Sequence, residues 1–531
     1  MSGRAIVWSI AGTDSGGGAG LSADQRAADA FGVHLAPVVA AVTAQHSTAV
    51  LRVDAVAPEL LDAQLQVLEA DLPPRVIKTG VLGSARNVGR VAACVDRLRQ
   101  RGPVALVVDP VLRASSGAAL ADRDLLAALR RELLPRADVV TPNRREAALL
   151  LGEPPFARHE LPAAARIFQA LGAGTVCITG GDEADAAGAF DWLLSAPAGS
   201  AQPPVERWLG LPRVHTQHTH GTGCSFASAI ASALALGFVP ADAVVLAKMA
   251  VAHALRHDAD RPTPGAGPGP VRLRAGFATD PAVLPWLTDD AVPFTPAAAG
   301  ARGGEALGLY AIVDSAERID AVLAAGVRTL QLRIKADRRD DPALRDALAR
   351  AIASARAAGA RLFVNDHWRL ALELGAGGVH LGQEDLLALD TGERAALRTA
   401  QRDGLQLGIS SHSLWELAQA AAWQPAYIAC GPVWPTLTKQ MPWRPQGLHN
   451  LAWWSAMAPA PVVAIGGILE PQQAAAAARC GASGVCIVRG LGDDPRQQVP
   501  VFAAAIRSGH GAAREPVPAL PRPSLSSAFV P

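Results

Sequence analysis

The chain has 531 residues, half of them hydrophobic and 18% charged, which indicates a globular protein of two or three domains and excludes a disordered chain. Its formal net charge of +1 gives no electrostatic reason to bind nucleic acid or an anionic membrane, although local phosphate sites stay open. The six cysteines form no CxxC pair, so we expect reduced thiols in a cytoplasmic protein. Because Asp14 interrupts the first apolar run, no signal peptide is expected, and no apolar stretch predicts a membrane helix.

Short β-branched runs alternate with Ala/Leu-rich amphipathic stretches through the first half of the chain. Helical periodicity covers Ser84–Arg99 and Asp122–Leu134. This alternation predicts a parallel sheet covered by helices on both faces. The expected strands are Ala5–Ile10, Val38–Val42, Val76–Lys78, Ala105–Val108, Val139–Val140 and Thr175–Thr179.

The alternation of strand-like and helix-like segments is interrupted between Asp258 and Glu305, where Pro, Gly and Ala dominate. We therefore expect a first domain at residues 1–275 and a linker at residues 276–305. Eight further parallel-type strands predict a (β/α)8 barrel at residues 306–508, and the Pro/Ser-rich residues 509–531 are expected to be a disordered tail. The expected barrel strands are Leu309–Val313, Thr329–Leu332, Arg361–Val364, Gly378–His380, Leu405–Ile409, Tyr427–Cys430, Val462–Ile465 and Gly484–Val488.

Two glycine-containing loops in the first half are candidates for binding or catalysis. The loop Ala11–Gly20 follows a strand, and its glycines would let the backbone approach a ligand, although a flexible turn explains them equally well. The loop His220–Ser225 precedes the Ala-rich stretch Phe226–Leu236, so its N–H groups would lie at a helix N-terminus and could hold a transferring phosphoryl group. Cys224 would there have a depressed pKa and could act as a base, although a small buried residue is the ordinary explanation of a single cysteine.

Six motifs in chain order resemble the hydroxymethylpyrimidine/phosphomethylpyrimidine kinases of the ribokinase-like superfamily. They cover roughly residues 1–275 and read AGTDSGGGAGLSAD, VTAQH, IKTGVL, VVDPVLRASSG, TPNRREAALLLG and THGTGCSFASAIA. The resemblance implies a three-layer α/β/α fold. It also implies that ATP phosphorylates 4-amino-5-hydroxymethyl-2-methylpyrimidine and then its monophosphate.

The same resemblance implies roles for individual residues. Gln45 would hydrogen-bond the aminopyrimidine, because an amide offers both a donor and an acceptor. Thr179 stands where many of these kinases carry lysine, so a cation near the phosphates is either lost or supplied by another residue. The expected residues are Gln45, Asp24 and Gly12 for the substrate; Gly221, Thr222, Gly223 and Cys224 for the anion hole and catalysis; and Asp109, Asn143 and Glu146 for the nucleotide and Mg²⁺.

Polar side chains follow the expected barrel strands at their C-terminal ends, where barrel active sites lie. Gln331, Arg333 and Lys335 share one face of a strand and predict an anion site, although a solvated strand end also carries such charges. Asp366 and Asp385 each follow a strand and suit Mg²⁺, although helix capping by aspartate is common.

The segments QLRIK, VNDHWRLALELGAGGVHLGQEDL, GISSH, YIACGPVWPTLTKQM and VAIGGI resemble thiamine-phosphate synthase over about residues 307–505. That family joins the pyrimidine methyl diphosphate to thiazole phosphate and releases pyrophosphate. The resemblance implies that Asp366 and Asp385 hold Mg²⁺, and Arg489 departs from the serine common at its position. The expected ligands are Gln331, Arg333, Lys335, Asn365, Ser410 and Lys439 for the pyrimidine diphosphate, and Thr436, Thr438, Gly467, Val488 and Arg489 for the thiazole phosphate.

The two implied activities are consecutive steps of thiamin biosynthesis, because the kinase product is the synthase substrate. Three alternatives stay open: a pyridoxal kinase in the first half, a non-synthase paralogue in the second, and a ligand-sensing module of a regulator. The sequence holds no basic DNA-binding segment that would favour the regulator. Homo-oligomerisation, domain orientation and direct transfer of the intermediate also stay open.

Overall fold

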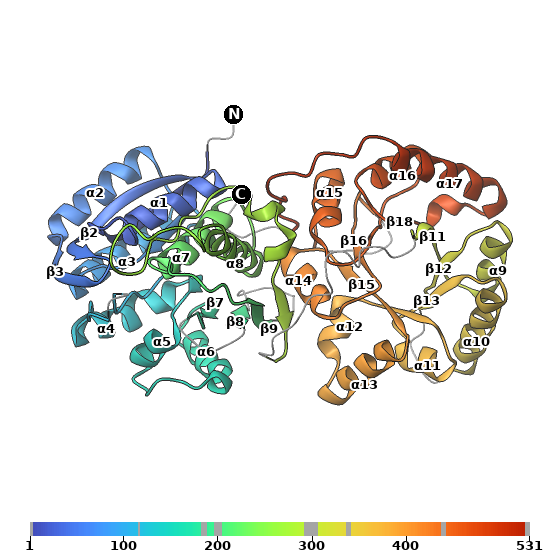
Figure 1. The fold of residues 1–531 in the computed structure, drawn as a ribbon, viewed down its shortest axis with the longest axis horizontal. Helices are drawn as coiled ribbons and strands as arrows, with labels where there is room; N and C mark the ends of the chain where they lie inside the picture. The colour runs from blue at the N-terminus through green and yellow to red at the C-terminus, as the bar shows by residue number, and fades with distance from the viewer. Residues whose placement is uncertain are drawn as a thin grey trace. The chain divides into compact units, whose positions relative to one another are not determined.

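The chain folds into two compact units, residues 1–294 with 525–531, and residues 295–524. The computed structural model describes residues 4–114, 117–181, 188–195, 204–290, 306–335, 341–436 and 442–525. Each unit has its own sheet and covering helices (Figure 1). The expected linker begins too early, because β10 (Trp286–Thr288) pairs with the sheet of the first unit. The first unit therefore extends at least to residue 290.

The first unit is built on a ten-stranded sheet of order β10-β9-β8-β7-β6-β5-β4-β1-β2-β3. Its middle strands run parallel, as expected. Antiparallel strands extend both edges; these were not expected, because no helical stretch separates most of them. The strands are β1 (Ile6–Gly12), β2 (His34–His46), β3 (Ala49–Ala55), β4 (Val76–Thr79), β5 (Ala105–Val108), β6 (Val139–Val140), β7 (Thr175–Ile178), β8 (Gly188–Ser195), β9 (Val205–Pro212) and β10.

Helices cover both faces of this sheet, which confirms the expected three layers. On one face, helices from the two ends of the unit, α1, α7 and α8, pack together. On the other face, Leu61, Val88, Leu125 and Phe168 from four different helices join one apolar core with the strands, and burying that core stabilises the unit. The helices are α1 (Gly20–Phe31), α2 (Pro58–Asp71), α3 (Ala85–Arg99), α4 (Arg123–Ala128), α5 (Arg144–Leu151), α6 (Leu161–Ala170), α7 (Thr222–Ala235) and α8 (Pro240–His257).

The second unit closes as a parallel barrel of eight strands, β11 to β18, as expected. Its interior contains an aromatic cluster of Tyr310, Phe363 and Tyr427. The strands are β11 (Gly308–Val313), β12 (Thr329–Leu332), β13 (Arg361–Asn365), β14 (Gly378–Leu381), β15 (Gln406–Ser411), β16 (Tyr427–Cys430), β17 (Val462–Ala464) and β18 (Gly484–Ile487). The helices are α9 (Ala316–Ala324), α10 (Pro342–Ala357), α11 (Trp368–Glu373), α12 (Gln383–Ala388), α13 (Thr391–Arg402), α14 (Leu414–Ala422), α15 (Gly447–Met457), α16 (Pro471–Arg479) and α17 (Pro495–Gly511).

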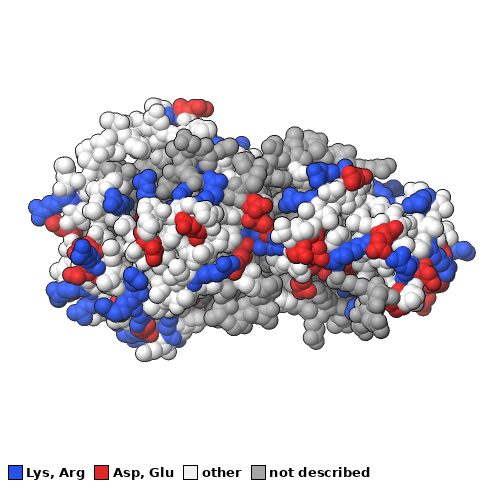
Figure 2. All heavy atoms as spheres, turned by 90° about the horizontal axis from the view of Figure 1, so that it is seen from below, with Lys and Arg blue, Asp and Glu red and all other residues white. Residues whose placement is uncertain are grey.

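The C-terminal segment differs from the expected disordered tail at residues 509–531. Helix α17 continues to Gly511, and the backbone of Arg522 hydrogen-bonds to Asn450 on α15. The expectation is therefore wrong up to residue 525; residues 526–531 lie outside the described part of the chain. None of the described helices combines the length and the apolarity needed to span a bilayer. On the face drawn in Figure 2, acidic and basic side chains are interspersed, in keeping with the net charge of +1.

Candidate active sites

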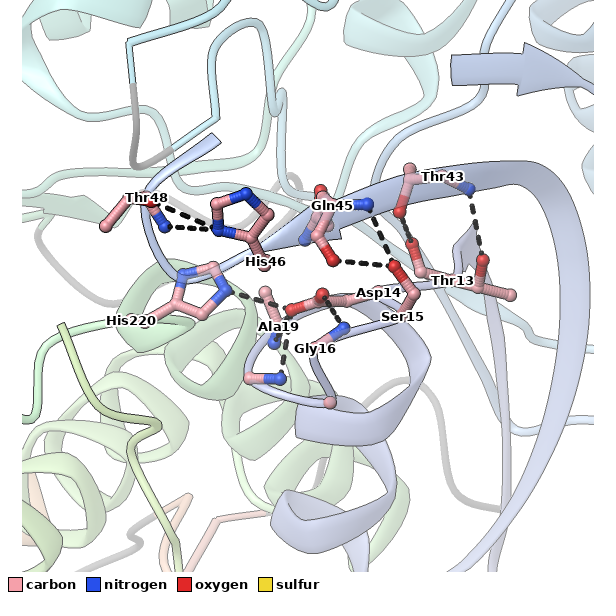
Figure 3. Close-up of polar contacts among 12 residues, drawn as sticks. Thr13, Asp14, Ser15, Gly16, Ala19, Thr43, Gln45, His46, Thr48 and His220 are labelled. Carbon is pink, nitrogen blue, oxygen red and sulfur yellow. Dashed lines mark hydrogen bonds and ion pairs between the residues drawn. The ribbon is translucent and has the colours of Figure 1, made fainter. Parts of the chain in front are cut away.

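Asp14 joins the two glycine-containing loops of the first unit. Its carboxylate accepts hydrogen bonds from the backbone N–H groups of Gly16 (2.8 Å), Gly18 (2.9 Å) and Ala19 (2.7 Å), and from His220 Nε2 (2.9 Å), as Figure 3 shows. Burial alone would raise the pKa of Asp14, but these hydrogen bonds, that of His220 first, hold the pKa well below its usual range. The first loop therefore uses three of its N–H groups internally, and it is ordered rather than merely flexible.

Gln45 lies beside this junction, at the end of β2 (Figure 3). Its N–H donates to Ser15 Oγ (2.8 Å), and the Ser15 hydroxyl donates to the Gln45 carbonyl (2.6 Å). Gly12 ends β1 and is buried where the register with β2 shifts. A Cβ atom at Gly18 would collide with the His220 ring, so only glycine fits where the loops meet. The structure thus brings Gln45 and Gly12, both expected near the substrate, to the same loop.

A buried lysine that sequence reasoning missed connects two of the expected aspartates. Lys78 Nζ lies 3.0 Å from Asp24 Oδ1 and 3.5 Å from Asp109 Oδ2. The hydroxyls of Ser9 (2.6 Å) and Ser228 (2.7 Å) also donate to Asp24. Burial opposes the charge on Lys78, but the carboxylate of Asp24 prevails and the pKa of Lys78 lies above its usual range. Asp24 is fully buried, so it acts as the counter-ion of Lys78 beneath the site.

Cys224 lies in the first turn of α7, which begins after Gly221 at Thr222. Gly221, Thr222, Gly223 and Cys224 thus occupy the helix N-terminus, as expected, where unpaired N–H groups can bind an anion. Burial first, and then the carboxylate of Asp109, raise the pKa of Cys224 to about 12. The expected depression of this pKa is wrong, because burial and the carboxylates of Asp109 and Asp24 outweigh the nearby Lys78.

Unpaired polar atoms line the C-terminal edge of the sheet at this point. Thr79 ends β4, Asp109 follows β5 and Thr141 follows β6. Thr79 Oγ1, Thr141 Oγ1 and Ser225 Oγ of α7 are buried without a hydrogen-bond partner among the described residues, while Asp109 Oδ2 beside them forms its ion pair with Lys78 at 3.5 Å. Buried polar atoms are nearly always hydrogen-bonded in native proteins. This row therefore indicates where a polar ligand binds.

Asn143 and Glu146 form the N-terminal cap of α5. Asn143 Oδ1 accepts from Glu146 N (2.9 Å), and Glu146 Oε2 accepts from Asn143 N (3.0 Å). Thr179 forms a β-bridge with Asn143. The next residue, Gly180, donates its N–H to Asp191 (3.0 Å), which also binds Lys248 (2.7 Å). The buried Lys248 is thus connected, through the Asp191 carboxylate, to Gly180, the residue after Thr179.

The expected residues of the second unit lie at the C-terminal ends of the barrel strands, where they form one ring. Thr438 and Lys439 lie outside the described residues. The ring members follow or end their strands in this order: Gln331, Arg333 and Lys335 at β12, Asn365 and Asp366 at β13, Asp385 after β14, Ser410 in β15, Thr436 after β16, Gly467 after β17, and Val488 and Arg489 after β18.

Asp366 and Asp385 form a carboxylate pair in this ring. Asp366 has a φ of 62°, an unusual and costly conformation for a residue with a side chain. Burial first, and then Asp385, raise the pKa of Asp366 to about 6, with a hydrogen bond between the two carboxyl groups. Asp385 Oδ2 also accepts the Gly382 N–H (2.9 Å). Two carboxylates held this close suit a hard divalent cation whose other ligands are water and substrate oxygens.

A chain of buried hydrogen bonds, not foreseen from the sequence, runs inside the barrel beneath the ring. Gln331 Nε2 donates to Tyr310 Oη (3.2 Å), which lies 2.6 Å from Tyr427 Oη. His380 connects Tyr427 (2.7 Å) to Ser410 Oγ (2.9 Å). Burial lowers the pKa of His380 to about 3, so this imidazole is neutral. The hydrogen bonds thus connect Gln331 on β12 with Ser410 on β15 through the barrel interior.

The turn after β17 is shaped by close packing. Gly467 has a φ of 72°, and a Cβ atom there would lie 2.6 Å from Trp434 Cβ, so the turn requires glycine. Val488 and Arg489 are exposed at the end of β18. Glycine turns after the last strands are common phosphate sites in such barrels.

Comparisons with known proteins match the two units to two different families. The Phosphomethylpyrimidine kinase family model matches residues 14–272, and the Thiamine monophosphate synthase model matches residues 309–491. The Probable thiamine biosynthetic bifunctional enzyme of Oryza sativa subsp. japonica is 33% identical over 507 residues, covering 92% of this chain and 86% of that protein. A Hydroxymethylpyrimidine/phosphomethylpyrimidine kinase of Rhizobium meliloti (strain 1021) is 41% identical over 273 residues, which are 50% of this chain and 96% of the relative. A Thiamine-phosphate synthase of Escherichia coli O1:K1 / APEC is 56% identical over 163 residues, 30% of this chain and 74% of the relative.

Proposed function

The chain belongs to the family of bifunctional thiamine biosynthetic enzymes, and from that premise we propose that each activity uses the site described above in its unit. The first unit phosphorylates 4-amino-5-hydroxymethyl-2-methylpyrimidine twice at the Asp109–Cys224 site. The second unit joins the resulting diphosphate to thiazole phosphate at the ring of barrel residues. The two families use ATP and Mg²⁺ generally.

The geometry of the first unit supports phosphoryl transfer. The N–H groups of the α7 N-terminus, from Thr222 to Cys224, would stabilise charge on the transferring phosphoryl group. Gln45 would orient the aminopyrimidine beside the loop held by Asp14. The Asp109 carboxylate and the unpaired Thr141 hydroxyl at the adjacent strand ends suit the hydrated cation and the phosphates of the nucleotide.

Cys224 and Asp109 are the groups that would take up the proton of the substrate hydroxyl. The Cys224 thiol hydrogen-bonds to Asp109, and its own pKa of about 12 keeps it protonated before substrate binds. As the substrate hydroxyl attacks the γ-phosphorus, its proton passes to Cys224 Sγ while the thiol proton passes to the Asp109 carboxylate. Lys78, bound to Asp24 and Asp109, keeps the local charge balanced.

The geometry of the second unit supports a dissociative coupling. Asp366 and Asp385 would hold Mg²⁺, which when bound neutralises charge on the leaving pyrophosphate. Arg333 and Lys335 add positive charge from β12, while Gln331 and Ser410 orient the pyrimidine. The aminopyrimidine stabilises the methylene cation as pyrophosphate departs, and the thiazole nitrogen then attacks. No protein nucleophile is needed for this sequence of steps.

One observation carries the proposal: in each unit, motif residues from separate chain segments converge at the C-terminal ends of parallel strands. Such ends form the binding edge of α/β sheets and barrels. In the first unit that edge also carries the row of unpaired oxygens.

A coupled assay on the full chain tests the proposal. Hydroxymethylpyrimidine, ATP, Mg²⁺ and thiazole phosphate are supplied, and thiamine phosphate is followed as fluorescent thiochrome. Cys224→Ala and Asp366→Ala should each abolish the product, and a mixture of the two variants should restore it, because each retains one intact site. Cys94→Ala and Glu384→Ala serve as matched controls, since Cys94 is buried in α3 and Glu384 is an exposed neighbour of Asp385.

Each failure of this assay has a distinct meaning. Accumulation of pyrimidine diphosphate without thiamine phosphate in the unaltered chain would refute the synthase site. Product formed only when the diphosphate is supplied would refute the kinase site. Pyridoxal offered in the same assay decides whether the first unit also accepts that alcohol.

A further inference from the structure

One face of α15 is polar although it is buried in the second unit. Gln446, at the start of the helix, Asn450 and Trp454 follow one another at four-residue spacing, so they lie on the same face. All are nearly inaccessible, with 3%, 1% and 0% of their surface exposed. Each carries a polar side-chain group, and such groups are buried in proteins only when they make specific hydrogen bonds.

The first contacts of this face reach the end of β15. Gln446 Nε2 donates to the His412 carbonyl (2.7 Å), and Trp454 Nε1 donates to Ser411 Oγ (2.9 Å). Asn450 Nδ2 donates to Gln446 Oε1 (2.8 Å), which fixes the orientation of the Gln446 amide. Ser411 directly follows Ser410, one of the residues expected to bind the diphosphate.

The backbone of the same segment reaches the next two strands. Gln446 N donates to the Pro432 carbonyl after β16 (2.8 Å). From that stretch, Val433 N donates to Ile465 O (2.8 Å) and Trp434 N donates to Gly466 O (3.1 Å), both after β17. Gln446 therefore bonds the residues that follow β15 and β16, and the stretch after β16 in turn bonds the residues that follow β17.

Residues 520–524 of the C-terminal segment hydrogen-bond to α15 and to the residues just before it. Arg522 N donates to Asn450 Oδ1 (2.7 Å), and Asn450 Nδ2 also donates to the Arg522 carbonyl (2.9 Å). Arg444 N donates to Ser524 O (2.7 Å), and His449 Nε2 bonds the Leu520 carbonyl (3.0 Å). The amide of Asn450 thus binds the C-terminal backbone on one side and Gln446 on the other.

We propose that Gln446 and Asn450, held by residues 520–524, are positioning residues that set the segments after β16 and β17 for the thiazole phosphate. The inference rests on the proposed function, which puts that phosphate at Gly467 and Thr436. Gly467 packs on Trp434, and Trp434 lies on the stretch that Gln446 anchors. Loosening the anchor should therefore disturb the phosphate turn. The pyrimidine diphosphate ligands on β12 and β13 lie on strands that the anchor does not touch, whereas Ser410 on β15 is next to its contacts with Ser411 and His412.

The test compares variants that differ in single hydrogen bonds. Asn450→Leu keeps a similar volume but removes the amide. Arg522→Pro removes the one N–H that donates to Asn450, and Arg522→Ala, which keeps that N–H, is its matched control. Losing a buried hydrogen-bond partner should raise the KM for thiazole phosphate roughly tenfold in Asn450→Leu and Arg522→Pro, and leave it unchanged in Arg522→Ala. The KM for the pyrimidine diphosphate should change less than that for thiazole phosphate, because Ser410 is the one described ligand of that diphosphate on a strand that the anchor touches. The kinase activity of the same chains should stay within about twofold.

Three results would overturn the proposal. The first is a thiazole phosphate KM that is unchanged in Asn450→Leu and Arg522→Pro. The second is an equal loss of kcat and of both affinities together with a lower Tm, which would mean that the anchor only supports the fold. The third is that the unaltered chain forms no thiamine phosphate when both synthase substrates are supplied. That result refutes the proposed synthase function and this inference with it. A failure of the inference alone leaves the unaltered chain active, so the two kinds of failure are distinguishable.

Discussion

His220 Nε2 lies 2.9 Å from Asp14 Oδ2, although 206 positions separate the two residues in the chain. This contact holds the loop that follows β1 against the loop that precedes α7. The position of the first loop in the proposed substrate site therefore depends on His220 of the second loop.

Asp14→Asn should slow the kinase without affecting the synthase. The amide cannot accept all the hydrogen bonds that the carboxylate receives from the backbone and His220, so the loops should separate. Losing a buried hydrogen bond to a charged group costs about 1.5–3 kcal/mol, which predicts a kinase rate roughly 10- to 100-fold lower. Asp29→Asn, on the exposed face of α1, is the control. Thiamine phosphate formation from supplied diphosphate should be unchanged, and equal kinase rates in the two variants would contradict the prediction.

Lys78→Met should destabilise the first unit strongly. It leaves Asp24 and Asp109 buried without their cation, and removing one partner of a buried pair typically costs about 3–5 kcal/mol. Urea unfolding followed by hydrogen exchange with mass spectrometry should show the loss in β4 and β5 but not in the barrel strands. Combining Lys78→Met with Asp24→Asn should recover part of the lost stability. A double variant no more stable than the single one would show that the charge pair is not the cause.

Cys224 should react slowly with iodoacetamide at neutral pH. Its pKa of about 12 leaves almost all of the thiol protonated, and only the thiolate is nucleophilic. The alkylation rate, measured by peptide mass spectrometry, should rise roughly tenfold per pH unit between pH 7 and 9. The other five cysteines are buried and provide the internal comparison. A rate that is already constant above pH 7 would mean that the helix N-terminus does depress this pKa.

Mg²⁺ binding by the synthase should weaken as the pH falls below about 6. The pKa of Asp366 is raised to about 6, so proton and metal compete there, and the apparent dissociation constant should rise up to tenfold per pH unit below that value. In the metal-free protein the sign is opposite: the raised pKa favours the folded state at low pH, and this contribution is lost as the pH rises through 6. In titration calorimetry, Mg²⁺ binding by Asp366→Asn should show no such pH dependence below pH 6. The control Glu384→Gln should keep it.

The sequence predicts regular elements well where apolar runs are buried on both faces. The strands Ala105–Val108, Thr329–Leu332 and Tyr427–Cys430 coincide with β5, β12 and β16. Antiparallel edge strands such as β3 escape prediction, because exposed residues there weaken the apolar pattern. The helix expected at Asp122–Leu134 instead passes from α4 into a π-helical turn at Leu129–Leu133, since local propensity does not resolve such a turn.

Candidate site residues are predictable from motifs, but their electrostatics are not. Their positions in motifs single out Asp24, Asp109 and Cys224, which the fold brings close to Lys78. Only the fold shows that Lys78 lies fully buried between Asp24 and Asp109. Only the fold shows, too, that burial of Cys224 and the carboxylate of Asp109 raise the pKa of that thiol against the effect of Lys78. The IKTGVL motif carried a signal for this lysine: lysine is almost never fully buried unless it is paired, so a lysine inside a short apolar strand indicates a buried carboxylate partner.

The position of β10 determines where the two halves can be separated. β10 pairs with β9 through Trp286, Leu287 and Thr288, just before the junction. A gene fragment that stopped at residue 275 would omit this strand and leave the outer edge of β9 free to pair with other molecules, a recognised cause of aggregation. A fragment ending at residue 290 keeps that edge covered, so it is the one to use for producing the first half alone.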